Sequence, residues 1–250
     1  MELYLKEKTA IVAGASQGIG RAIAKELAIE GVRVLAVGRN KHLLRSLAEE
    51  VEAAGGVTLL EMVQDLTAAD SSVEIAKAAL SEFGKVDILI NNAGRSQQLD
   101  VIDSEEKWTE SMTLEFERPR QLTQALLPQF IKRRQGVILN TISTYELKTI
   151  NASAIAKTAL VAWSKQLSAQ VGRHGIRVNC LQPGLIDTEN TRRIFTNEQR
   201  RTFAEREIAL GDFGEPQDMA NMAVFLVSPR ARYVTGTVTV VDGGMRYYPF

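Results

Sequence analysis

Short runs rich in β-branched residues alternate along the chain with longer segments whose apolar residues recur at helical spacing. This alternation is typical of an α/β protein, because strand–helix–strand units pack back onto a parallel sheet with a fixed hand. The pattern predicts a doubly wound parallel sheet of about seven strands with helices on both faces. The expected strands are 9–13, 33–37, 58–63, 86–90, 137–142, 177–181 and 237–241. The expected helices are 20–30, 42–54, 71–83, 105–134, 153–172 and 216–228.

The chain reads as one domain over residues 1–250, because no Pro/Gly linker, composition break or internal repeat divides it. The segment at about 186–214 is charged and lacks strand character. In an open α/β sheet an insertion after a late strand lies over the carboxyl ends of the strands, where ligands bind. We therefore expect this segment to be a substrate lid.

Composition narrows the classes of partner. Thirty basic and 30 acidic residues give a formal net charge of zero, so we expect neither nucleic acid nor a membrane surface as the partner. The chain has no apolar run of membrane-spanning length, and its N-terminus lacks the pattern of a signal peptide. One cysteine, Cys180, lies in an apolar run and reads as a core residue, which fits a cytoplasmic location. No Cys/His/carboxylate cluster predicts a metal site.

A glycine-rich turn follows the first expected strand. Gly14 would close the turn, Gly18 would let the backbone approach a diphosphate, and Gly20 would allow close helix–strand packing. The helix that follows would direct its free N–H groups and its positive dipole end at the phosphates. The turn predicts a Rossmann-type dinucleotide site.

The end of the second expected strand indicates which dinucleotide is bound. An acidic residue about 20 positions after the glycine turn would select NAD(H), whereas an arginine there accommodates a 2′-phosphate. Arg39 lies 19 residues beyond Gly20, next to Asn40, and its guanidinium can bind phosphate in a bidentate manner. We expect NADP(H). Gln17 stands where such turns often carry a basic residue, so NAD(H) remains an alternative.

Further motifs follow in order: Asn91-Asn92-Ala93-Gly94 after the fourth strand, Ser143 after the fifth, Lys157 in the next helix, and Pro183-Gly184 after the sixth. Together with the glycine turn they resemble the short-chain dehydrogenase/reductase family, most closely the 3-oxoacyl-carrier-protein reductase type. The resemblance extends to the end of the chain, through Tyr233-Val234-Thr235-Gly236 and Val241-Asp242-Gly243-Gly244.

The resemblance implies roles for individual positions. Ser16, Gln17 and Ile19 would lie around the diphosphate together with the three glycines of the turn. Asp65 and Leu66 would flank the adenine, and Lys157 would hold the nicotinamide ribose. Asn92, Ala93 and Gly94 would line the ribose side of the adenosine, and the residues cradling the nicotinamide would be Pro183, Gly184, Ile186 and Thr188.

The catalytic set departs from the family. The family uses Asn, Ser, Tyr and Lys; here Ser143 and Lys157 are in place, but the tyrosine position is Ser153 and the asparagine position is Glu115. A serine hydroxyl is a poorer proton donor than a phenol and is shorter. Tyr145 is a candidate replacement acid/base, or an aromatic residue of the pocket wall.

Glu115 admits several interpretations. It would point to solvent, pair with Lys157 or Arg118, or act as a proton donor or base. Three functions therefore remain open: an NADP(H)-dependent carbonyl reductase or alcohol dehydrogenase with an atypical proton relay, a diverged lyase, isomerase or dehydratase, and a non-catalytic nucleotide-binding protein.

Two expectations concern partners. The alternating charges of the lid indicate either a solvated helix face or recognition of an anionic or carrier-bound small-molecule carbonyl or alcohol substrate. The expected helix 153–172 carries small and apolar residues on more than one face, and the family pairs this helix between subunits. We therefore expect a homotetramer or homodimer.

Overall fold

The computed structural model describes residues 2–143 and 149–246. Its centre is a seven-stranded, fully parallel sheet with the strand order β3-β2-β1-β4-β5-β6-β7. The order reverses beside β1, which is the arrangement of a doubly wound fold. The predicted fold class is confirmed. The strands are β1 (Thr9–Ala13), β2 (Arg33–Gly38), β3 (Leu60–Val63), β4 (Ile88–Asn91), β5 (Gly136–Thr141), β6 (Ile176–Pro183) and β7 (Val238–Val241).

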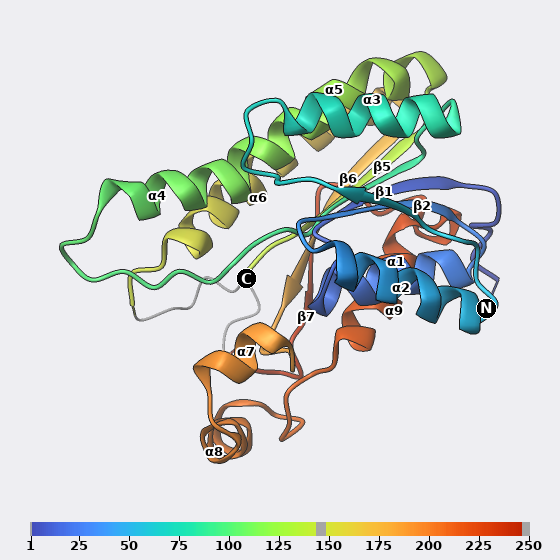
Figure 1. Ribbon diagram of the computed structural model, residues 1–250. Coiled ribbons are helices and arrows are strands. Elements are labelled where there is room, and N and C mark those ends of the chain that lie inside the picture. Colours follow the sequence, from blue (N-terminus) through green and yellow to red (C-terminus); the bar gives the residue numbers. More distant parts are fainter. Residues whose placement is uncertain (1, 144–148, 247–250) are drawn as a thin grey trace.

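Helices cover both faces of this sheet (Figure 1). On one face α1, α2 and α9 pack over strand residues such as Ala10 and Val12. On the other face α3, α5 and α6 pack over their neighbours Ile11 and Ala13. The alternation follows from the two-residue period of a strand, which sends successive side chains to opposite faces. The α-helices are α1 (Gly18–Ile29), α2 (Lys41–Ala53), α3 (Ser71–Phe83), α4 (Glu105–Met112), α5 (Arg118–Arg133), α6 (Ala152–Val171), α7 (Glu189–Ile194), α8 (Asn197–Glu207) and α9 (Pro216–Val227).

The expected helix 105–134 is not one α-helix, because its backbone hydrogen-bond pattern changes partway along. A π-helical turn, η1 (Thr113–Glu117), separates α4 from α5. A π-turn widens the helix by one residue and commonly occurs at functional sites. The predicted single α-helix was wrong at this point.

The segment expected as a lid forms two helices. Each begins with a threonine whose hydroxyl accepts the N–H three residues on, Thr188 for α7 and Thr196 for α8. In Figure 1 α7 and α8 project from the body of the fold, below the end of the sheet where β7 lies. Phe195, Phe203 and Phe213 hold them together through ring contacts at 5.9–6.2 Å between centroids.

Two shorter 3₁₀ turns, η2 (Gly172–His174) and η3 (Pro229–Ala231), complete the described elements. No helix of the described residues is long and apolar enough to cross a membrane.

Candidate active site

The glycine turn has the backbone that its spacing predicts. Gly14 and Gly18 adopt φ values of +88° and +56°, which side-chain-bearing residues rarely adopt. A Cβ on Gly20 would collide with the carbonyl oxygen of Gly14 and lie 2.5 Å from Asn92 Nδ2. The turn therefore packs tightly against β4, because Asn92 Nδ2 also donates to the Gly14 carbonyl at 3.2 Å.

This turn leaves polar groups available to a ligand. Gln17 precedes α1 without a capping side-chain hydrogen bond, so the first N–H groups of the helix remain open. The Oδ1 atom of Asn92 is buried beside the turn and has no hydrogen-bond partner among the described residues. Open N–H groups at a helix start are what a dinucleotide diphosphate requires, and these residues fit such a group.

Arg21, which the sequence analysis did not single out, fixes the turn to the neighbouring helix. Its guanidinium donates to the carbonyls of Ser16 (3.4 Å) and Leu43 (2.7 Å) and pairs with Glu50 at 2.7 Å. The hydrogen bond from Arg21 lowers the pKa of the Glu50 carboxyl. Arg21 directly follows Gly20 in the sequence. This position is the signal that identifies it as a residue of the first helix close to the turn.

The residues expected at the adenosine lie at the ends of β2 and β3. Arg39 is exposed directly after β2. The Thr67 N–H, at 2.9 Å, holds the pKa of the Asp65 carboxyl below its usual range, and the Thr67 hydroxyl and the positive Arg39 act in the same direction. Asn40 uses its side chain to cap α2 by accepting from the Leu43 N–H at 3.1 Å. In this structure Asn40 therefore orders the helix next to Arg39.

The residues expected at the nicotinamide lie at the end of β6 and at the start of the segment expected as a lid. Pro183 is the last residue of β6 rather than the first after it. A Cβ on Gly184 would lie 2.6 Å from the Asp242 backbone, so glycine lets these two segments cross. A Cβ on Gly18 would lie 3.3 Å from Thr188 Cγ2. The start of the lid thus faces the glycine turn, with Ile186 buried beneath it.

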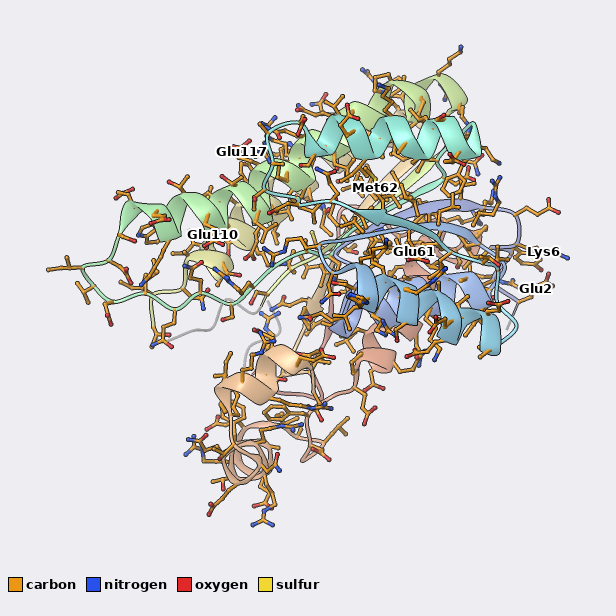
Figure 2. All side chains as sticks on the ribbon, in the orientation of Figure 1. Glu2, Lys6, Glu61, Met62, Glu110 and Glu117 are labelled. Carbon is orange, nitrogen blue, oxygen red and sulfur yellow. The ribbon has the colours of Figure 1, made fainter. Side chains whose placement is uncertain are left out.

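The π-turn brings Glu115 into the interior. Its side chain is 1% exposed, and its Oε2 accepts a hydrogen bond of 2.5 Å from the Ser153 hydroxyl. Its Oε1 accepts the backbone N–H of Arg95 at 3.1 Å. Figure 2 labels Glu110, which lies on α4 before this turn, and Glu117, which is the last residue of the turn. The interpretation of Glu115 as a solvent-facing residue is wrong, because the packing of α4 and η1 against α6 encloses it.

Lys157 lies one helical turn beyond Ser153 on α6. Its Nζ donates to the Thr141 carbonyl at 2.7 Å and lies 3.8 Å from Glu115 Oε2. Burial lowers the pKa of Lys157, and the negative Glu115 opposes this shift. Glu115 therefore pairs with Lys157, as one interpretation held. Arg118 instead donates to Gln121 and to the Thr67 carbonyl.

Gly94 lies directly against the side chains of Lys157 and Glu115. A Cβ there would lie 2.9 Å from Lys157 Cε and 3.1 Å from Glu115 Oε2. The end of β4 therefore brings a segment expected to line the cofactor into contact with the candidate catalytic residues. Ser143 lies two residues after the end of β5, at the same edge of the sheet. Tyr145 lies outside the described residues.

The lid arginines largely pair within the lid. Asp187 forms ion pairs with Arg200 at 2.6 Å and Arg192 at 2.8 Å, and hydrogen bonds from Arg192 hold the pKa of Asp187 below its usual value. Cys180 is buried, as expected, and burial raises its pKa to about 11. Among the described residues no His, Cys, Asp and Glu side chains group in a way that could hold a metal ion.

A doubly wound sheet with a dinucleotide cradle and a buried lysine at the carboxyl ends of its strands defines a nucleotide-dependent enzyme class. The family model described as enoyl-(acyl carrier protein) reductase matches residues 14–246. The chain belongs to this family of short-chain dehydrogenases/reductases, and the resemblance stated from its motifs is confirmed.

Individual relatives extend over the whole chain. The chain is 34% identical over 249 residues to 3-oxoacyl-(acyl-carrier-protein) reductase of Chlamydia muridarum, covering 98% of this chain and 100% of the relative. It is similar to the crystal structure of L-sorbose reductase from Gluconobacter frateurii complexed with NADPH and L-sorbose, with a TM-score of 0.93, 30% identity and 99% and 100% coverage. It is also similar to a 7α-hydroxysteroid dehydrogenase complexed with NADH and 7-oxo glycochenodeoxycholic acid, with a TM-score of 0.92, 32% identity and 98% and 96% coverage. These relatives are oxidoreductases, in agreement with the expected enzyme class.

Proposed function

We propose that this protein is an NADP(H)-dependent oxidoreductase that interconverts a carbonyl compound and an alcohol, with a proton relay through Ser153 and Glu115. The observation that carries the proposal is the buried Glu115–Ser153–Lys157 cluster at the edge of the sheet where the glycine turn also lies. The relatives solved with NADPH or NADH support the class of cofactor.

The cofactor would be held by groups that the fold already orders. The glycine turn and the start of α1 would take the diphosphate, Arg39 the 2′-phosphate, and Lys157 the nicotinamide ribose. Thr188 and Gly184 would lie at the nicotinamide. When bound, the nicotinamide supplies or accepts the hydride at the substrate carbon.

The chain's own residues would move the proton. In the reducing direction, the O–H bond of Ser153 breaks as its proton passes to the substrate oxygen, which has gained the electron pair of the C=O π bond. In the structure the Ser153 hydroxyl donates to Glu115 Oε2, so this step requires the hydroxyl to turn to the substrate and Glu115 first to take up a proton from solvent. That proton then passes to the Ser153 oxygen across the 2.5 Å contact. Glu115 is left as a carboxylate, and a proton from solvent restores it. General acid catalysis of this kind contributes about 10²–10⁴-fold.

Two neighbours would stabilise the carboxylate that forms. The ammonium of Lys157 lies 3.8 Å from Oε2, and the Arg95 N–H binds Oε1. Both groups are held by backbone contacts, so they need no reorganisation when the charge develops. In this arrangement Glu115 would hold the proton, and Ser153 would transfer it to the substrate oxygen.

The substrate class follows from the lid and the relatives. We infer a small-molecule carbonyl or alcohol, because the relatives act on such groups in sugar, steroid and acyl compounds. Asp187 pairs with two lid arginines, Arg192 and Arg200, so this trio keeps one net positive charge. That charge is compatible with an anionic substrate as well as with a neutral one.

We also propose that the protein assembles as a homodimer or homotetramer through α6. Ile155 is 47% exposed on this helix. Ala162, two helical turns later on the same face, is exposed as well. An apolar exposed face on a helix whose other face is already buried is typical of an interface. Light scattering checks this: a mass of 27.6 kDa at micromolar concentration would contradict assembly.

The proton relay is tested with a panel of ketones and alcohols and both nucleotides. Ser153→Ala and Glu115→Gln should each lower turnover by about 10²–10⁴-fold while leaving NADPH affinity within twofold, because neither residue is assigned to the nucleotide. Tyr145→Phe is the matched control, and it should retain turnover.

The outcomes separate the alternatives. Loss of turnover in Tyr145→Phe with full activity in Glu115→Gln would assign the proton to Tyr145 instead. If no ketone or alcohol reacts with either nucleotide, the oxidoreductase proposal falls, and lyase, isomerase, dehydratase or purely nucleotide-binding roles take its place.

A further inference from the structure

A cavity lies at the end of the sheet opposite the candidate active site, where the strands begin. Its volume is about 320 Å³, within the range of about 300–1,000 Å³ typical of small-molecule sites. Residues that precede or open β1, β4, β5 and β6 line it, together with the end of α9 and the turn that follows. Since the strands are parallel, this cavity is separated from the candidate active site by the length of the sheet.

The floor of the cavity is apolar. The first residues of three neighbouring strands supply Ile88, Val137 and Ile176. Ile88 of β4 lies opposite Val137 of β5 in the sheet register. Leu5 and Val227 close the floor from the N-terminal segment and from α9. A ligand seated here would cover aliphatic side chains.

Cationic side chains stand at the walls. Lys8 and Arg232 line the cavity, and neither forms a side-chain hydrogen bond or ion pair with any residue in the described part of the chain. Arg177 is a third cation in the lining, and its guanidinium donates to the carbonyls of Leu226 and Ser228. Neutral carbonyls bind Arg177 without cancelling its charge.

The acid among the described lining residues does not offset these cations. Asp87 is buried, with its carboxylate 2.6 Å from Arg133 and 3.5 Å from Lys85. The two positive charges of Arg133 and Lys85 therefore exceed the one negative charge of Asp87, without counting Lys8 and Arg232. The cavity combines an apolar floor with a net positive wall, although the whole chain carries no net charge.

We propose that this cavity binds a small organic anion with an aliphatic body, of the class of medium-chain carboxylates, with the carboxylate directed to Lys8 and Arg232 and the chain on the apolar floor. Unpaired cations over an apolar surface favour such an amphiphile, since charge-assisted hydrogen bonds at one end add to apolar burial at the other. The site is independent of the nucleotide and of the proposed reaction.

The probes are octanoate and 1-octanol, which share the chain and differ in the charged head. Calorimetric titration of the full-length protein is made with and without saturating NADP⁺, so that binding in the active site is recognised by competition. We expect octanoate to bind at least tenfold more tightly than octanol, and NADP⁺ to leave its affinity within twofold.

Two variants locate the site. Lys8→Ala combined with Arg232→Ala should weaken octanoate binding at least tenfold, and Lys77→Ala, an exposed lysine on α3, is the matched control. Gly172→Leu should block the cavity, because Gly172 has helical dihedrals of −56° and −40° and a Cβ there meets no atom within 4 Å. Thermal unfolding checks that each variant is folded.

Loss of binding in both variants, with Lys77→Ala unchanged, supports the proposal. It is overturned if octanol binds as tightly as octanoate, if NADP⁺ displaces octanoate, if both variants bind normally, or if octanoate does not bind below its solubility limit.

Discussion

The hydroxyl of Ser153 donates to Glu115 Oε2 across 2.5 Å, and this contact joins the first turn of α6 to the π-turn between α4 and α5. The sequence analysis assigns these two residues to the positions where the family carries tyrosine and asparagine. Because they contact each other, we propose that the two departures form one coupled change rather than two separate losses. A buried carboxylate needs a donor, and the shorter serine leaves room for it.

This coupling predicts a non-additive pair of substitutions. Ser153→Tyr alone should lower carbonyl reduction, because Ser153 is 4% exposed and a phenol would have to displace Glu115. Ser153→Tyr combined with Glu115→Asn should recover at least tenfold in kcat/KM relative to Ser153→Tyr alone, since it removes the carboxylate and restores the family's pair. Steady-state kinetics of the four proteins of the cycle measures the coupling. Additive effects would show that the residues act independently.

Gly94 is predicted to be intolerant of a methyl group. A Cβ there would lie 2.9 Å and 3.0 Å from Lys157 Cε and Nζ, so Gly94→Ala should shift the lysine and reduce turnover at least tenfold. Overpacking of this kind costs about 1–3 kcal/mol in the free energy of unfolding. Gly172→Ala is the control, because its Cβ meets nothing within 4 Å and its dihedrals are helical. Equal turnover in the two variants would contradict the packing argument.

Arg39 is predicted to select the phosphorylated nucleotide. It is exposed directly after β2 and near Asp65, so it is free to bind a 2′-phosphate. Arg39→Ser should weaken NADPH binding about tenfold to a hundredfold, the equivalent of losing one charge-assisted hydrogen bond or more, and leave NADH binding within twofold. Calorimetry with both nucleotides measures the ratio, with Arg193→Ala in the lid as a control. An unchanged ratio would remove Arg39 from nucleotide selection.

The sequence predicted the sheet and the glycine turn because their signals are local. A buried strand needs a continuous apolar run, and the turn after β1 needs glycine at positions with positive φ, so both leave a residue pattern. The two lid helices had a readable signal as well. Thr196 followed three residues later by Gln199 is a capping-box pattern, yet the segment was expected only as a charged lid.

The candidate catalytic cluster could not be predicted in the same way. The π-turn at Thr113–Glu117 has no composition of its own and coincides with tertiary contacts that hold Glu115. One contact comes from the backbone of Arg95 and the other from Ser153, which lies 38 residues away. Sequence alone therefore left Glu115 between solvent, an ion pair and a catalytic role, and only the packing of α6 against η1 decides between solvent and interior.

The last prediction concerns Asp87, the residue directly before β4. Burial opposes ionisation of this carboxyl, but the hydrogen bond from Arg133 and those from Thr9 outweigh it and hold its pKa below the usual 3.8. A depressed carboxyl pKa stabilises the folded state at every pH above the ordinary value, and this stability is lost as pH falls through the folded-state pKa. Asp87→Asn should therefore lower the free energy of unfolding by about 1–3 kcal/mol at pH 7, because Arg133 loses its charged partner.

The pH dependence distinguishes this electrostatic effect from a simple packing defect. The difference between wild type and Asp87→Asn should be constant from pH 7 to pH 5, and should narrow as pH falls from about 4.5 through 3.8 and below, where the wild-type carboxyl takes up its proton first in the unfolded chain. Urea unfolding at a series of pH values measures it. Asp70→Asn, which removes an exposed acid at the start of α3 that makes no capping bond, is the control and should show no such difference. A difference that persists unchanged below pH 4 would mean that Asp87 stabilises the fold by shape and neutral hydrogen bonds rather than by its charge.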